Sequence, residues 1–134
     1  GVNAADLRNF AGTLGNAALQ LESGELFQLA EDLWKRAIGF NPTHAGVHYQ
    51  YGDFLIDRGR IDEAATALRR AQDLDPRDAR SLRLETKISL ARGTFDPTIE
   101  ERLRSAWEQN RANKQAAMSY LRFVAASGTL EHFE

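Results

Sequence analysis

Glycine and proline recur in this 134-residue chain at a nearly fixed interval. The interval from Pro42 to Pro76 equals the interval from Gly59 to Gly93. Each of these two glycines is followed two positions later by a bulky apolar residue. Similarity at such a period predicts a stack of similar supersecondary units, because each unit can bury its apolar face only against its neighbours.

Between these marks, the apolar residues follow the spacing of helices. Ile61, Ala64, Leu68 and Ala71 recur every three or four positions, which places them on one face of a helix. No segment alternates apolar and polar residues long enough to predict a strand. Similar stripes predict seven helices, over about 7–21, 27–38, 47–55, 61–71, 78–92, 99–107 and 117–124.

Local chemistry marks several of the expected helix ends. Asp96 followed by Pro97 is typical of a helix start, because the carboxylate accepts from backbone N–H groups and proline fits the first helical position. Gly59, Gly93 and Gly128 each follow a predicted helix, where a residue in the left-handed conformation can end it. These signals agree with the helix ranges that the apolar stripes predict.

Residues 45–78 resemble a tetratricopeptide repeat, a family whose repeating unit is a helix–turn–helix of the same period. They read AGVHYQYGDFLIDRGRIDEAATALRRAQDLDPRD. The small and large residues typical of the family occur at Gly52, Gly59, Ala64, Leu68, Ala71 and Pro76. The resemblance implies an all-α fold, a right-handed α-solenoid of antiparallel helix pairs. It extends over 1–134 as one domain, with repeats at about 11–44, 45–78 and 79–113 and a partial one at 114–134, expected to be a fragment of a longer protein.

In this family the first helix of each pair lines a concave groove, which usually binds a peptide or a partner helix. The resemblance therefore implies a non-catalytic protein–protein interaction module. Tyr49 is predicted to point into the groove as its best aromatic anchor, whereas Tyr51 is predicted to point inward. The transferred groove positions give these candidate partner-binding residues: Asn16, Tyr49, Gln50, Asp53, Arg80, Arg83, Lys87 and Arg122. Leu84, Gln115, Met118 and Ser119 are also expected in the groove.

Four of these candidates make the C-terminal half of the expected groove cationic. Arg80, Arg83 and Lys87 are spaced i, i+3 and i+7, so they share a helical face, and Arg122 is expected on the next groove helix. Arginine pairs with carboxylates through two parallel hydrogen bonds, so an acidic segment or a free C-terminus is a plausible ligand.

Two alternatives stand beside this interpretation. The cationic face could simply be solvated, with Asp78 and Glu85 pairing locally with the basic residues. The chain could also self-associate as a scaffold, with the terminal repeats of two copies stacked on each other.

Composition and motifs argue against several other functions. The net charge is −2, from 17 basic and 19 acidic residues, which does not favour a nucleic acid as partner. The chain has no cysteine, and no motif such as G-x-S-x-G or H-E-x-x-H suggests catalysis. His44 and His48 are four residues apart, but no third ligand is evident, so we expect neither a metal nor another cofactor.

No apolar run approaches the length that a transmembrane helix needs, and the first residues lack the pattern of a signal peptide. Insertion into a membrane is therefore not expected, and the compartment is left open between cytoplasm and periplasm. Trp34 and Trp107 both fall on apolar stripes, so we expect them in the core rather than at a binding surface.

Overall fold

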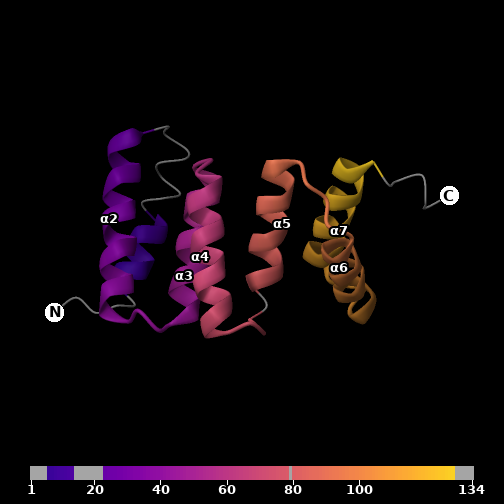
Figure 1. Ribbon diagram of the computed structural model, residues 1–134, viewed down its shortest axis with the longest axis horizontal. Coiled ribbons are helices and arrows are strands. Elements are labelled where there is room, and N and C mark those ends of the chain that lie inside the picture. The colour runs from indigo at the N-terminus through magenta and orange to yellow at the C-terminus, as the bar shows by residue number, and fades with distance from the viewer. Residues whose placement is uncertain (1–5, 14–22, 79, 129–134) are drawn as a thin grey trace. The chain divides into compact units, whose positions relative to one another are not determined.

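The computed structural model describes residues 6–13, 23–78 and 80–128, and the regular secondary structure in these ranges is helical throughout. Residues 6–13 form a helical segment. The helices that follow are α2 (Gly24–Phe40), α3 (Ala45–Asp57), α4 (Ile61–Leu74), α5 (Arg80–Arg92), α6 (Pro97–Gln109) and α7 (Lys114–Ser127) (Figure 1). The predicted all-α fold is confirmed, and every predicted helix overlaps an observed helical range. The chain divides into two compact units, Gly1–Ser81 and Leu82–Glu134.

The helix ends follow the chemistry of the sequence. Asp96 caps α6 by accepting a hydrogen bond of 2.9 Å from the backbone N–H of Thr98, and Pro97 is the first helical residue, as predicted. Asn113 caps α7 in the same way, with its side-chain oxygen 3.0 and 3.2 Å from two backbone nitrogens. Gly59, Gly93 and Gly128 all have positive φ, as predicted for residues that end helices.

In the first unit, α3 packs against both α2 and α4 (Figure 1). Ala64 and Ala71 on α4 are completely buried, and such small side chains let two helices approach closely. The contact between α3 and α2 includes an aromatic pair. The ring centroids of Phe27 on α2 and Phe54 on α3 are 6.1 Å apart. Helix α3 is therefore in contact with two other helices, and most of its residues are buried.

A charged contact also joins α2 to the turn before α4. The Glu31 side chain is only 8% exposed, and Arg60 donates a hydrogen bond to it. Arg60 also donates to Glu63, with a distance of 2.9 Å between Nε and the nearer carboxylate oxygen. The hydrogen bonds to Glu63 and Glu31 raise the pKa of Arg60, and the pKa of Glu63 is lowered by the same guanidinium. One arginine thus links two helices of the unit.

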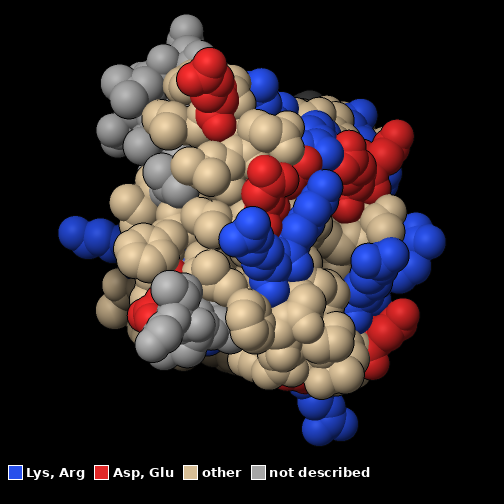
Figure 2. All heavy atoms as spheres, turned by 90° about the vertical axis from the view of Figure 1, so that its left-hand side faces the viewer, with Lys and Arg blue, Asp and Glu red and all other residues tan. Residues whose placement is uncertain are grey.

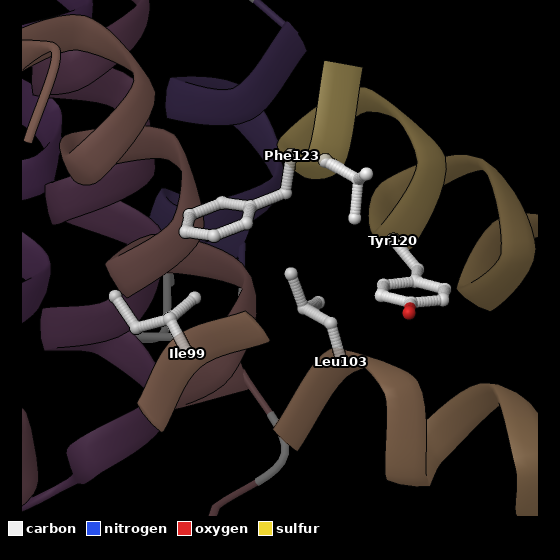
Figure 3. Packing of buried hydrophobic residues seen from close by; sticks show 5 residues of the cluster. Ile99, Leu103, Tyr120 and Phe123 are labelled. Carbon is white, nitrogen blue, oxygen red and sulfur yellow. The ribbon is translucent and has the colours of Figure 1, made fainter. Parts of the chain in front are cut away.

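The second unit is held together by an apolar cluster between α6 and α7. Ile99 and Leu103 of α6 point toward Tyr120 and Phe123 of α7, and all four are nearly completely buried (Figure 3). Phe95 meets Phe123 edge to face, with ring centroids 5.5 Å apart. The partly buried side chains packed against this cluster are Leu82, Leu90, Phe95 and Trp107. Part of α5 is therefore fixed to the same core.

The two histidines considered above as metal ligands have structural partners. His44 is the N-cap of α3 and accepts a hydrogen bond from the backbone N–H of Val47. His48 is buried, and its Nε2 lies 2.8 Å from the carbonyl oxygen of Pro42. Trp34 is 4% exposed, as expected for a core residue. No helix among the described residues is both long enough and apolar enough to cross a membrane.

Candidate functional site

The second unit contains a cavity of about 560 Å³, which has the size of a small-ligand or peptide-side-chain site. Its walls come from three helices. The wall on α5 consists of Arg83, Thr86, Lys87 and Leu90, and α6 contributes Leu103. The wall on α7 consists of Lys114, Gln115, Met118, Ser119 and Arg122.

All the charged residues that line this cavity are positively charged. Four of its ten lining residues are Lys or Arg, and none is Asp or Glu. The chain as a whole is slightly acidic, with a net charge of −2. Like charges around a hollow with apolar walls concentrate the electrostatic potential there and attract ligands of the opposite sign.

One face of the molecule does not show this separation of charge. On the face seen in Figure 2, lysine and arginine side chains lie beside aspartate and glutamate side chains. Their fields partly cancel at a short distance, since neighbouring opposite charges screen each other. The cavity therefore differs in charge from that face.

The cavity has apolar walls as well as charged ones. Leu103 is 4% exposed and belongs to the core cluster, so it forms a fixed apolar wall. Met118 is 50% exposed although it is apolar, and its side chain is long and flexible. A ligand that reached it would remove apolar surface from water.

The structure brings three of the predicted partner-binding residues to this cavity. Arg83 and Lys87 lie one helical turn apart on α5, and Arg122 faces them from α7. The expected groove residues Gln115, Met118 and Ser119 line the same cavity. Helical spacing predicted a shared face for Arg83 and Lys87, and the groove positions implied by the resemblance placed the residues of α7 with them.

Arg80 does not line the cavity, although it was predicted to share a face with Arg83 and Lys87. Its guanidinium pairs with Asp78, with distances of 3.0 Å from Nε to Oδ1 and 2.7 Å from Nη2 to Oδ2. These hydrogen bonds lower the pKa of Asp78 and raise the pKa of Arg80. Local pairing with Asp78, which was the alternative interpretation, therefore describes Arg80.

The prediction that Tyr49 is an exposed anchor is wrong. Tyr49 is 2% exposed, and its hydroxyl donates a hydrogen bond of 2.9 Å to the carbonyl oxygen of Asp75. The Arg80 guanidinium lies over its ring, 5.9 Å from the centroid. Tyr49 thus connects α3 to the end of α4 and has no surface to offer a partner. Leu84, also expected in the groove, is 2% exposed.

Two further candidates lie outside the cavity. Gln50 is exposed on α3, and Asp53 on the same helix is partly buried. Asn16 lies outside the described residues. In the described part of the chain, no group of three His, Asp or Glu side chains is arranged to hold a metal ion.

The sequence interpretation missed four of the lining residues. Leu103 lies on an apolar stripe that was expected to be core, and Thr86 and Leu90 were not assigned to the groove. Lys114 is the first residue of α7 and was not assigned to any stripe. Its spacing of four residues from Met118, and of eight from Arg122, is the signal that could have identified it.

Helix pairs that recur at a nearly constant interval, with a ligand-sized cavity lined mainly by α5 and α7, define a helical-repeat protein. The chain belongs to the tetratricopeptide repeat family, whose model matches residues 21–88. Proteins of this family generally mediate protein–protein interactions.

Two curated relatives share part of this region. The protein O-mannosyl-transferase TMTC1 of Homo sapiens is 37% identical over 62 residues, which is 46% of this chain. The protein of the same name from Mus musculus matches to the same extent. This chain spans only 7% of the length of either relative, so the likeness concerns the repeat region. No solved structure matches the chain.

Proposed function

We propose that this chain is a non-catalytic interaction module that binds an acidic segment of a partner protein in the cavity between α5 and α7. The single observation that carries the proposal is the cationic lining, with four basic and no acidic residues in a chain of net charge −2. Membership of the tetratricopeptide repeat family supports a protein as the partner. The charge of the cavity adds the chemistry that the partner should have.

The shape and composition of the cavity support a polypeptide ligand. A volume of about 560 Å³ accommodates several side chains rather than a single ion. Gln115 and Ser119 offer hydrogen-bonding groups between the basic residues, and a peptide backbone has both donors and acceptors for them. Arginine and lysine would then pair with the carboxylates of the bound segment.

A synthetic acidic peptide tests this function directly. The probe is acetyl-GESESESEG-amide, which carries four glutamates and no charged ends. Isothermal titration calorimetry at low ionic strength should show binding that weakens as salt is added, because exposed charges interact over a shorter range in salt. A peptide in which lysine replaces every glutamate should not bind.

Charge reversal identifies the site. Lys87→Glu combined with Arg122→Glu should abolish binding of the acidic peptide, since both residues line the cavity. Arg104→Glu is the matched control, because Arg104 is exposed on α6 of the same unit and lies outside the cavity lining. Equal affinities for all three proteins would reject the cavity as the binding site, and no binding to the unaltered chain would reject the proposed ligand.

Self-association stays a prediction from the sequence. Light scattering of the purified chain over a range of concentrations would measure it. A monomer that binds the acidic peptide supports the proposed function, whereas a dimer whose formation competes with the peptide would make a second copy the occupant of the cavity.

A further inference from the structure

Along one side of α7, the side chains that line the cavity form a stripe that alternates between basic and apolar. Lys114, Met118 and Arg122 are spaced i, i+4 and i+8, so they follow one side of the helix, and all three line the cavity. The helical rise separates consecutive members by about 6 Å along the axis. A ligand that lies along α7 therefore meets a cation, an apolar side chain and a second cation in turn.

In an extended peptide, the side chains on one face are separated by nearly the same distance as the members of the α7 stripe. Its alternate side chains face the same side and are about 6.6 Å apart. Two acidic residues at positions i and i+4 of such a segment would lie about 13 Å apart, close to the roughly 12 Å between the first and last members of the α7 stripe. The residue at i+2 would then face the middle of the stripe.

Building on the proposed function, we propose that the bound segment is extended and carries the pattern acid–x–apolar–x–acid. Its two carboxylates pair with Lys114 and Arg122, and its central apolar side chain covers Met118. The pattern is symmetric, so it fits α7 in either chain direction.

The apolar position follows from the exposure of Met118. Half of this side chain is open to water, and it lines the cavity together with Leu90 and Leu103. A segment that carried only acidic residues would leave this apolar surface uncovered or place charge against it, which is unfavourable. An aliphatic side chain at the central position removes it from water, and methionine adapts to the shape of what it contacts.

Two acidic residues match the spacing of the two cations along α7. Lys114 and Arg122 are about 12 Å apart along the helix axis, so carboxylates at positions i and i+4 of an extended segment can each pair with one of them, and the two long side chains need not converge on a single carboxylate. The opposite wall of the cavity is also positively charged, with Arg83 and Lys87 one helical turn apart on α5. An internal acidic segment uses this length, whereas a single free C-terminus does not.

Peptides of identical composition test the pattern. The matching peptide is acetyl-SGESLSEGS-amide, and the shifted peptide is acetyl-SGELSSEGS-amide, in which the leucine is moved by one position. Calorimetry at low ionic strength should show that the shifted peptide binds at least about fivefold more weakly, because its leucine faces away from the cavity when both glutamates are paired. Blocked ends keep a terminal carboxylate out of the comparison.

Two variants locate the effect. Met118→Gln keeps the length of the side chain and removes its apolar end, so it should bring the two affinities to the same value. Arg122→Glu should abolish binding of both peptides.

The outcomes separate this inference from the proposed function. Equal affinities of the unaltered chain for the matching and shifted peptides, with both lost in Arg122→Glu, would overturn the pattern and leave the acidic ligand standing. The same holds if acetyl-GESESESEG-amide binds and neither leucine peptide does. Failure of all three peptides to bind would overturn both proposals.

Discussion

Phe123→Ala should destabilise the second unit more than any change on the exposed side of the same helix. Phe123 is 1% exposed and belongs to the cluster that joins α6 to α7 (Figure 3). It also makes the edge-to-face contact with Phe95. Removing the ring leaves a hole in the packing that holds one wall of the cavity in place.

The expected cost follows from the burial of the ring. A completely buried phenylalanine changed to alanine typically costs about 3–5 kcal/mol, which includes both lost transfer free energy and the hole left behind. A urea dependence of about 2 kcal/mol per molar converts a cost near 4 kcal/mol into a lower unfolding midpoint, by about 2 M. Binding of acidic peptides to the cavity should be lost in parallel, since α7 supplies half of its lining.

The two tryptophans allow this unit to be followed by itself. Trp34 belongs to the first unit, whereas Trp107 packs against the Phe123 cluster. In a Trp34→Phe background, fluorescence during urea unfolding therefore reports on the second unit. Both the reference protein and the Phe123→Ala variant should be measured in this background.

Leu121→Ala is the matched control for this experiment. Leu121 lies two residues earlier on α7 and is 48% exposed, so its truncation removes little buried surface. We expect a cost of about 1 kcal/mol or less, because a half-exposed leucine gains only part of the free energy of complete burial. Equal costs for the two variants would show that the cluster does not hold α7, and the packing argument would fail.

Three further perturbations have definite expected results. Arg60→Met should cost about 2 kcal/mol in thermal or urea unfolding, because the buried Glu31 loses its main cation, and adding Glu31→Gln should restore at least half of that loss. The pKa of Asp78 is lowered by its hydrogen bonds from Arg80, so this pair stabilises the fold above the ordinary Asp pKa and the stabilisation is lost as the pH falls through the lowered value. Melting temperatures between pH 5 and pH 2 should therefore fall more steeply for the unaltered protein than for Arg80→Gln. Gly93→Ala should cost roughly 1 kcal/mol, because an L side chain is strained at positive φ even though no neighbour lies near the added methyl group; an unchanged unfolding midpoint would contradict this.

Much of the architecture could be predicted because its causes are local. Apolar residues at helical spacing, Asp96 before Pro97, and glycines where the chain must turn with positive φ are all short-range signals. They gave the helices and their order. The same spacing predicted that Arg83 and Lys87 share one side of α5, and both line the cavity.

The burial of Tyr49 could not be predicted in this way, because it depends on residues that are distant in the sequence. Its hydroxyl bonds to the carbonyl of Asp75, 26 residues later, and its ring is covered by Arg80. Helical periodicity shows which residues share a face but not what lies against that face. Arg80 differs from Tyr49 in this respect, because its partner Asp78 is only two residues away and the sequence analysis had named this local pairing as the alternative.

The contact between Glu31 and Arg60 also bears on how a repetitive chain stacks in the right order. Apolar residues recur at similar spacing in the helix pairs, so this pattern alone does not specify which pair packs beside which. The residue after the turn glycine is Arg60 in one pair but Thr94 in the next, so only one arrangement places a guanidinium beside the buried carboxylate. Any other arrangement would leave that largely buried carboxylate with only Lys35 of its own helix, 3.4 Å away, as a cation, which is unfavourable. A single ion pair thereby distinguishes one junction of the stack from its neighbours.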